Sequence, residues 1–192
     1  MVTQRTGVKD ESNTVVNQRL PGLLAEVCGV EVEDYDSLSN DMQNSLEFTI
    51  SELREACATV GVLCDILKPT TATVVAQYTQ DYYAGKPAIT QNIFGKGNAF
   101  YVGTELDSTG MDWLLELTCK TAGVQPAIVP AGVELSHRSN GNSSWLFILN
   151  HSAEKVNVSF EGQGLDLLTS TQVNGSIELE SSGVAIIQFS AK

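Results

Sequence analysis

Two histidines, four cysteines and 23 acidic residues are the side chains that could do chemistry in this 192-residue chain. The histidines, His137 and His151, are 14 residues apart, in a segment of alternating apolar runs. A transition-metal site needs His, Cys or Asp ligands gathered in a tighter cluster. We therefore expect no metal site, and we interpret His151, in "LNHS", as a hydrogen-bonding residue at a strand end.

The cysteines are Cys28, Cys57, Cys64 and Cys119, flanked by apolar residues in "EVCGV" and "GVLCDIL". They contain no C-x-x-C pair, which argues against a zinc knuckle or a redox motif. We expect buried free thiols in a reducing cytosol.

Nucleophilic catalysis lacks its usual sequence context. A Cys–His–Glu amidotransferase needs Gly-x-Cys-x-Gly at its nucleophile, and Cys28 has Glu26 where the first glycine belongs. A Ser–His–Asp enzyme needs Gly-x-Ser-x-Gly, which is absent from the sequence. We assign no catalytic residue on these grounds.

Glycoside hydrolysis needs two carboxyl groups held roughly 5–10 Å apart. Most acidic residues lie in exposed-looking runs such as "EVEDYD", and none stands isolated in an apolar strand as an active-site glutamate would. Trp145, in "SWLFILN", could stack on a sugar, but an aromatic residue in an alternating strand belongs more often to the core. We expect no catalytic, cofactor-binding or metal-binding residues.

Gly95-Lys96-Gly97 could be a phosphate-binding loop or the tip of a hairpin. A phosphate loop has wider glycine spacing and leads into a helix. Here "NAFYVGT" follows and "AITQNIF" precedes, and both alternate like strands. The sequence therefore predicts a hairpin in which Gly95 and Gly97 supply positive backbone angles.

The formal net charge is −12, from 23 acidic and 11 basic residues. Such a charge repels nucleic acids and anionic membranes, so we expect neither as a partner. The sequence shows no signal segment and no apolar run near the roughly 20 residues that span a bilayer. We expect a cytoplasmic location.

Helices are predicted at 21–29 and 108–123, each ended by a glycine. The second has an apolar stripe through Met111, Leu114, Leu115 and Thr118. The strand predictions in this part are "VEVEDY", "LEFTI" and "TVVAQYT", and the period from 53 to 68 is ambiguous.

The stretch 124–132, "VQPAIVPAG", is a predicted linker with two prolines and no charge. Residues 1–127 are predicted to form an α/β domain. Residues 131–192 are predicted to form a small antiparallel β-sandwich of six strands. These strands are "VELSHR", "SWLFILNHS", "KVNVSF", "LDLLT", "SIELE" and "GVAIIQF".

Several stretches, in order, carry a resemblance to a known family. They are "TGVKDESNTV", "PGLLAEVCGVEVEDYDSL", "YYAGKPAITQNIFGKGNAFYVGTELD", "LFILNHSAEKVNVSF", "DLLT" and "SSGVAIIQF". The chain resembles the C-terminal portion of the family 42 glycoside hydrolases, which are bacterial β-galactosidases. Residues 51–72 fit the spacing of that family, but their identities are less telling.

The resemblance implies an incomplete flavodoxin/amidotransferase-like α/β domain, of the trimerisation type and without its first strands, followed by a small β-domain. It also implies that the N-terminal (β/α)8 barrel, with both catalytic glutamates, is the partner of this piece in a homotrimeric parent enzyme. The acid/base glutamate of that family follows an asparagine, and this sequence has no Asn-Glu dipeptide.

The resemblance favours a non-catalytic, structural or oligomerisation part of a retaining β-galactosidase. Two alternatives stay open. One is a stand-alone carbohydrate-binding module, suggested by the sandwich and Trp145. The other is a degenerate amidotransferase-like regulatory domain, suggested by the α/β half alone.

Overall fold

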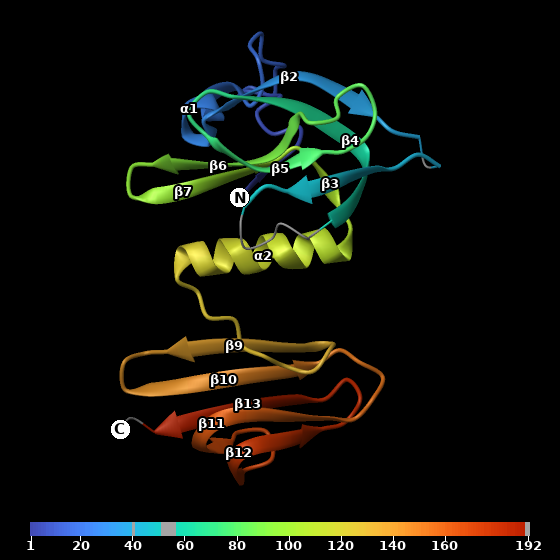
Figure 1. Cartoon of the computed structure of the whole chain (residues 1–192). Coiled ribbons are helices and arrows are strands. Elements are labelled where there is room, and N and C mark those ends of the chain that lie inside the picture. The colour runs from blue at the N-terminus through green and yellow to red at the C-terminus, as the bar shows by residue number, and fades with distance from the viewer. Residues whose placement is uncertain (40, 51–56, 191–192) are drawn as a thin grey trace. The chain divides into compact units, whose positions relative to one another are not determined.

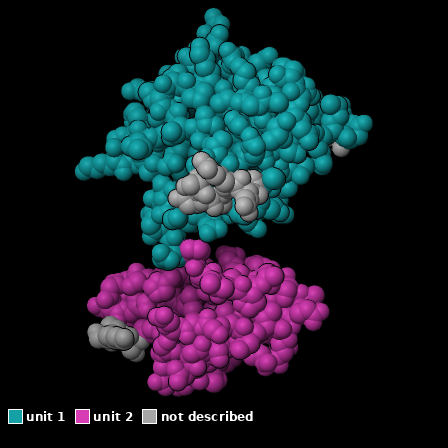
Figure 2. Space-filling model, viewed as in Figure 1, with its two compact units in different colours: residues 1–125 teal, residues 126–192 magenta. Residues whose placement is uncertain are grey.

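The computed structural model describes residues 1–39, 41–50 and 57–190. The chain divides into two compact units, residues 1–125 and 126–192, which Figure 2 shows in teal and magenta. Each unit has a β-sheet of its own (Figure 1). Residues 53–56 of the ambiguous stretch lie outside the described residues.

The first unit contains an eight-stranded sheet in the order β1-β7-β6-β5-β3-β4-β2, with β8 paired to β4. Its strands are β1 (Val2–Thr3), β2 (Val30–Ser37), β3 (Asn44–Phe48), β4 (Cys57–Pro69), β5 (Thr73–Tyr78), β6 (Pro87–Phe94), β7 (Gly97–Val102) and β8 (Thr104–Leu106). The predicted strands "VEVEDY", "LEFTI" and "TVVAQYT" correspond to β2, β3 and β5. The described part of the ambiguous stretch is β4.

Strand direction in this sheet is antiparallel except where β1 pairs with β7. A flavodoxin-like sheet is parallel, and each of its strand pairs needs a crossover of a dozen or more residues, usually a helix. Most successive strands here are joined by short turns instead. The prediction of a flavodoxin-like α/β domain is therefore not confirmed, and the unit is mainly an antiparallel sheet.

Strand β4 is long because it serves three neighbours. Its first residues pair with β3, its last residues with β2, and its middle with β8. The pairing with β8 shifts register between Gly61 and Cys64, and Val62 at that irregularity has a φ of 64°. A β-branched residue at positive φ is strained.

The β6–β7 connection is the predicted hairpin, with Phe94 paired to Gly97. Gly95 has a φ of 58°, whereas Lys96 and Gly97 are not among the positive-φ residues. A two-residue turn with positive φ only at its first position is of type II′. The turn is thus confirmed, but the prediction of a positive angle at Gly97 is wrong, because Gly97 already belongs to β7.

The first helical segment consists of η1 (Gly22–Leu24) and α1 (Ala25–Cys28), and Gly29 ends it in the left-handed conformation. This confirms the helix predicted at 21–29. A Cβ at residue 29 would lie 2.5 Å from Thr71 Oγ1 and from Asn92 Cγ, so glycine also permits close packing there.

Helix α2 (Ser108–Ala122) confirms the second predicted helix and ends at Gly123, with a φ of 67°. Its buried face was predicted incompletely. Leu114 is fully buried and Trp113 and Leu117 pack on the core, whereas Leu115 is 45% exposed. No helix in the described residues is long and apolar enough to cross a membrane.

The first unit buries apolar side chains on both faces of its sheet. On one face, α2 covers a core that includes Phe48, Val60 and Ile89 (Figure 1). On the other, the N-terminal segment packs Cys28 and Leu20 around Val30, Val32, Leu67 and Tyr101. Strand β4 contributes to both cores, through Val60 to the first and Leu67 to the second.

The second unit is one five-stranded antiparallel sheet in the order β12-β11-β13-β10-β9. Its strands are β9 (Val133–Ser139), β10 (Ser143–Asn150), β11 (Val156–Asp166), β12 (Thr171–Leu179) and β13 (Val184–Ser190). The prediction of six strands is wrong, because "KVNVSF" and the first two residues of "LDLLT" belong to the single strand β11, and the rest of "LDLLT" forms the turn after it. The predicted second layer of a sandwich is not found among residues 133–190.

An irregularity between Ser159 and Gln163 interrupts the pairing of β11 with β12. Such a bulge bends a strand and increases its twist. The sheet therefore curves around its own core, in which Ile148, Val158 and Ile187 are fully buried.

Candidate functional site

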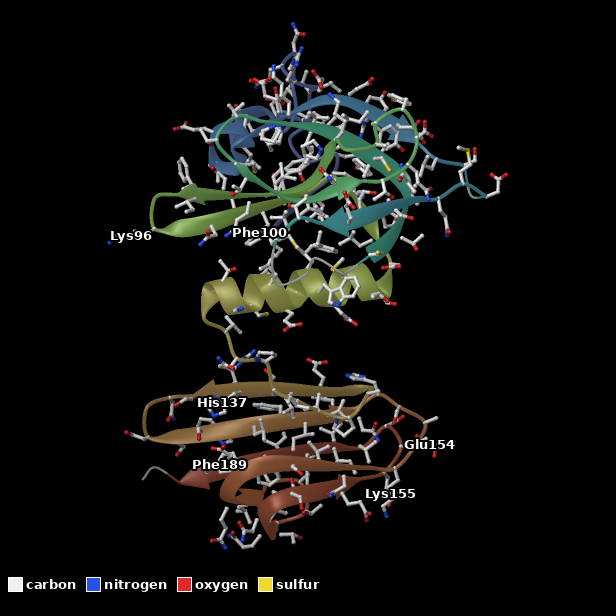
Figure 3. The ribbon with its side chains drawn as sticks, viewed as in Figure 1. Lys96, Phe100, His137, Glu154, Lys155 and Phe189 are labelled. Carbon is white, nitrogen blue, oxygen red and sulfur yellow. The ribbon has the colours of Figure 1, made fainter. Side chains whose placement is uncertain are left out.

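The structure separates the two histidines. His137 lies on β9 (Figure 3), and His151 follows β10, with its Nε2 3.1 Å from Glu134 Oε2. His151 is thus a hydrogen-bonding residue at a strand end, as predicted. The described residues hold no group of three or more His, Cys, Asp or Glu side chains that could bind a metal ion.

The four cysteines are free thiols in the structure. Cys28 and Cys64 are buried, and burial raises the pKa of the Cys28 thiol. Cys119 is half-buried and Cys57 is exposed, so the prediction of burial is wrong for Cys57. Cys57 is the first residue of β4, and it belongs to neither core cluster of the first unit.

The sequence pattern did not predict that the carboxylate of Asp65 is buried. It lies in β4 between Cys64 and Ile66 and is 1% exposed. Tyr101 Oη donates a hydrogen bond to Asp65 Oδ2 at 2.9 Å, and Tyr78 Oη donates to the Asp65 main-chain oxygen at 3.0 Å. The statement that no acidic residue stands isolated in an apolar strand is therefore wrong.

Burial raises the pKa of Asp65, while the Tyr101 hydrogen bond and the nearby Arg5 lower it in part. The same site raises the pKa of Tyr101 above its ordinary value, mainly through desolvation. A perturbed carboxylic acid is a frequent mark of a catalytic site. Asp65, however, lines none of the three hollows described below, so no substrate would reach it there.

The second unit also has a buried carboxylate, Asp166, which is 2% exposed. Its oxygens accept hydrogen bonds from Leu168 N, Ile186 N and, at 2.6 Å, Thr169 Oγ1. The side chain therefore fixes the turn after β11 to the neighbouring strand β13. This is a structural role, because both oxygens already have donors from the protein.

Three hollows in the described residues have volumes of about 850, 550 and 380 Å³. Glu161 lines the first and Glu105 the third, while no acidic side chain lines the second. Glycoside hydrolysis by the usual mechanisms needs two carboxyl groups that flank one bond. None of these hollows supplies such a pair.

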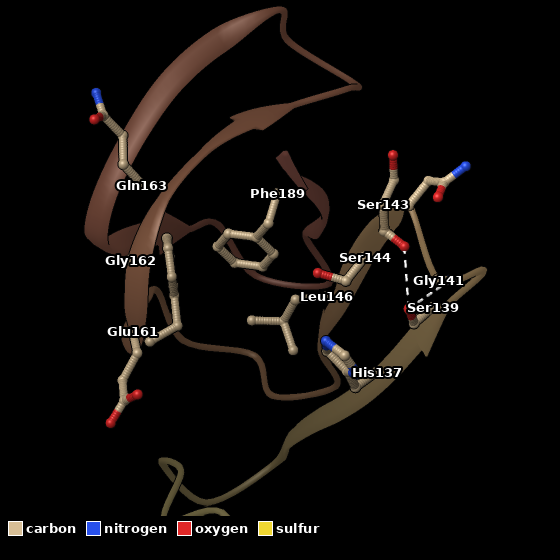
Figure 4. Close-up of a pocket in the computed structure, with 12 residues that line it drawn as sticks. His137, Ser139, Gly141, Ser143, Ser144, Leu146, Glu161, Gly162, Gln163 and Phe189 are labelled. Atoms are coloured by element: carbon tan, nitrogen blue, oxygen red, sulfur yellow. Dashed lines mark hydrogen bonds between the residues drawn. The ribbon is translucent and has the colours of Figure 1, made fainter. Parts of the chain in front are cut away.

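The largest of these three hollows, which we name the C-terminal hollow, lies within the second unit (Figure 4). His137 and Ser144 line one side, Gly162 and Gln163 the opposite side, and Phe189 lies between them. Phe160 packs edge-on against Phe189, with ring centroids 6.0 Å apart. The hollow thus combines an aromatic wall with polar groups, of which Glu161 is the acidic one.

Trp145 does not line this hollow. It pairs with Arg138 and Gln188 across the sheet, and it lies in β10 between Ser144 and Leu146, which do line the hollow. Because successive strand residues face opposite sides, Trp145 lies on the other face of the sheet. It is half-buried and outside the core cluster, so the prediction of a core residue is wrong.

Family models match both units of the chain. The model described as "Beta-galactosidase trimerisation domain" matches residues 1–125, and the one described as "Beta-galactosidase C-terminal domain" matches residues 132–189.

Individual relatives agree with these matches. The chain is 34% identical, over 97% of its length, to β-galactosidase BgaA of Planococcus sp. (strain 'SOS Orange'). Its structure resembles β-galactosidase from Bacillus circulans sp. alkalophilus with a TM-score of 0.88 and 33% identity over 98% of this chain. For β-galactosidase from Rahnella sp. R3 the TM-score is 0.83, with 27% identity over the same share.

The chain spans only 28% of the length of each of these three relatives. The matched part comprises the two domains that the family models describe, in the same order. The chain belongs to the β-galactosidase trimerisation-domain family, and it carries the β-galactosidase C-terminal domain after that domain.

Proposed function

We propose that this chain serves as the non-catalytic C-terminal part of a longer retaining β-galactosidase, which hydrolyses terminal β-D-galactosides. The observation that carries this proposal is the ordered match of the two domains against enzymes of which the chain spans 28%. The hollows support it, since none of the three holds the pair of carboxylates that the reaction needs.

The partners that follow from this proposal are an N-terminal (β/α)8 barrel of the same polypeptide and two further copies of the enzyme in a homotrimer. The name of the first domain supports the oligomer. A stable interface typically buries roughly 1,200–2,000 Å² in total, and we expect the first unit to provide a part of it. We expect the barrel to provide the rest.

In the longer protein, we expect further strands to extend the first sheet beyond β1. The parallel pairing of β1 with β7 supports this, because parallel pairs are the rule in α/β domains. We also propose a cytoplasmic location, supported by four thiols that form no disulfide.

Activity is tested with the purified chain of 192 residues and a chromogenic β-galactoside. We expect no hydrolysis above the rate in buffer, and full-length Planococcus BgaA is the positive control. Measurable turnover that survives repurification would contradict the assignment of a non-catalytic part.

The supporting role needs a second experiment. BgaA truncated before the matched region is compared with a chimera in which this chain replaces that region. We expect the truncated enzyme to lose its trimer and most of its activity, and the chimera to regain both, as measured by light scattering and galactoside hydrolysis. A truncated enzyme that stays trimeric and fully active would show that this part supports neither.

No finding favours the stand-alone carbohydrate-binding module over this proposal, because both units match domains of a longer enzyme. The sheet of the first unit is antiparallel except for the β1–β7 pair, so it does not support an amidotransferase-like regulatory domain, whose sheet would be parallel.

A further inference from the structure

The C-terminal hollow has the dimensions of a small-molecule site. Its volume is about 850 Å³, and ligand pockets usually measure roughly 300–1,000 Å³. It opens between the β9–β10 hairpin and the bulged part of β11 (Figure 4). Both borders belong to strands of the same sheet, so the walls are part of the fold of the second unit.

Glycines on β11 leave the aromatic ring of Phe189 uncovered in one wall of the hollow. A Cβ at Gly162 would lie 3.8 Å from Phe189 Cε1, in contact with the ring. A Cβ at Gly164 would lie 2.6 Å from Ile187 Cγ2 and therefore cannot be added without a shift of the core. Because these positions carry no side chain, the Phe189 ring remains half-exposed toward the hollow.

Most polar residues that line the hollow are hydrogen-bonding side chains without a formal charge. His137, Ser144 and Gln163 line it, and within the described residues their side chains have no hydrogen-bond partner from the protein. Ser139, in contrast, is already bonded to the main-chain oxygen of Ser143 at 3.2 Å. Imidazole, hydroxyl and amide groups can each donate and accept hydrogen bonds.

The charge of the side chains that line the hollow argues against anionic ligands. Neither lysine nor arginine is among the residues that line the hollow, and its one charged side chain is the carboxylate of Glu161. The chain as a whole carries a net charge of −12. Phosphorylated or carboxylated ligands would therefore be repelled.

We propose that the C-terminal hollow binds a neutral saccharide, one to two sugar units long. An apolar C–H face of a sugar ring packs on Phe189, while ring hydroxyls exchange hydrogen bonds with Ser144, His137 and Gln163. Hydroxyl groups that both donate and accept match these side chains, and an aromatic ring supplies apolar contact without demanding a charge. The site differs in position from the surface around Trp145, which lies on the opposite face of the sheet.

This inference does not depend on the proposed function. A saccharide site in the second unit requires neither a barrel nor a trimer, and it would be present even if the chain proved to have no part in a galactosidase. Conversely, an empty hollow would leave the role of the two domains in a longer enzyme unaffected.

The test is a titration of the ¹⁵N-labelled 192-residue chain, followed by NMR, with D-galactose, lactose and D-glucose up to about 50 mM. We expect saturable shifts of the Gly162 and Phe189 amides with a dissociation constant on the order of 1–10 mM for at least one sugar. Inorganic phosphate is the anion control and should leave these amides unchanged. Absence of saturable shifts with all three sugars would overturn the proposal.

Two variants locate the site. Phe189→Ala removes the aromatic wall, and Ser144→Phe fills the hollow while leaving the core residues in place; each should weaken binding at least fivefold. Ser144→Phe keeps the test valid if Phe189→Ala does not fold, since aromatic residues are favoured in strands. Trp145→Ala is the matched control and should bind as the unmodified chain does. Loss of binding in Trp145→Ala, with binding retained in Ser144→Phe, would place the sugar on the other face and refute the proposal.

Discussion

Asp107 connects helix α2 to the sheet of the first unit, and its removal should uncouple the two. Its Oδ1 accepts a hydrogen bond from Gly110 N at 2.7 Å, which caps the helix, and its Oδ2 accepts one from Thr59 N of β4 at 3.0 Å. The Gly110 bond lowers the pKa of Asp107, so the carboxylate is charged at neutral pH. One side chain thus serves two elements.

The expected cost of Asp107→Ala follows from these two bonds. Loss of an N-cap costs about 1 kcal/mol, and loss of a hydrogen bond to a charged acceptor about 1.5–3 kcal/mol when buried. Asp107 is only half-buried, which reduces the second figure. We expect the free energy of unfolding of the first unit to fall by about 2–3 kcal/mol.

Urea titration followed by Trp113 fluorescence measures this change. Trp113 lies on α2 and packs edge-on against Phe48, with ring centroids 5.7 Å apart, so its emission reports the first unit. A Trp145→Phe background removes the signal of the second unit. Asp112→Ala, which removes an exposed charge from the same helix, is the control and should change the free energy by less than about 0.5 kcal/mol.

The isosteric change Asp107→Asn separates the two bonds. The amide oxygen can still cap Gly110, whereas its –NH₂ would face the Thr59 donor, so we expect about half the cost of the alanine variant. The penalty should also depend on pH. Because the folded pKa is lowered, the contribution of the carboxylate is fully present above the unfolded value of about 3.9 and is lost as the pH falls through the folded pKa. If Asp107→Ala costs no more than Asp112→Ala, this account of the helix attachment is refuted.

Three further predictions concern the first unit. Leu114→Ala should lower the free energy of unfolding by about 2–5 kcal/mol, because the side chain is fully buried. Leu115→Ala, at a 45% exposed position, should change it by less than about 0.5 kcal/mol. Equal effects of the two variants in urea titration would contradict the observed buried face of α2. Val62→Gly should raise the free energy of unfolding by up to about 1 kcal/mol, because the relief of about 1–2 kcal/mol of left-handed backbone strain exceeds the entropic cost of a more flexible unfolded chain. A fall of more than about 1 kcal/mol would show that contacts of the Val62 side chain stabilise the fold. Asp65→Asn should change the pH dependence of stability, because the raised pKa of Asp65 means that the folded state binds this proton more tightly than the unfolded state does. The unmodified chain should therefore gain stability relative to the variant as the pH falls from 7 toward about 4. Parallel pH profiles of the two proteins would argue against a raised pKa.

The elements that the sequence predicted well are those with local signals. The β6–β7 hairpin follows from two alternating runs around Gly95, and α2 follows from an apolar period that ends at Gly123. In both cases the residues that decide the structure are within a few positions of one another. Only details set by the neighbouring sheet were wrong, such as the exposed position of Leu115.

The direction of the strands could not be predicted in the same way. An alternating or apolar run fits a parallel and an antiparallel sheet equally well, and the choice depends on pairing between distant segments. Strand β4 shows this, because its three neighbours β2, β3 and β8 come from both sides of it in the sequence. The helix α2 next to short strands then suggested an α/β order that the sheet does not have.

Asp65 was missed for a related reason. In "GVLCDILKP" a single carboxylate among apolar residues has no local feature that shows whether it is buried. Its partner Tyr101 is 36 residues away, and the hydrogen bond exists only because β4 and β7 contribute to the same core. The C-terminal hollow was missed likewise, since Gly162 and Phe189 meet only after β11 bends.

The buried polar groups of this chain indicate what kind of work it does. A catalytic group must keep bonding capacity for its substrate, so it lies in a cleft with some of its partners missing. Asp65 and Asp166 instead accept hydrogen bonds from Tyr101, Thr169 and main-chain donors, and these bonds join one strand to another. Among the buried side-chain polar atoms of the described residues, Thr90 Oγ1 alone has no partner, and a hydroxyl on a buried strand offers no acid or base at neutral pH. The buried carboxylates thus join strands within each unit, which agrees with the supporting role proposed above. His137, Ser144 and Gln163 line the C-terminal hollow instead, where a neutral ligand could reach them.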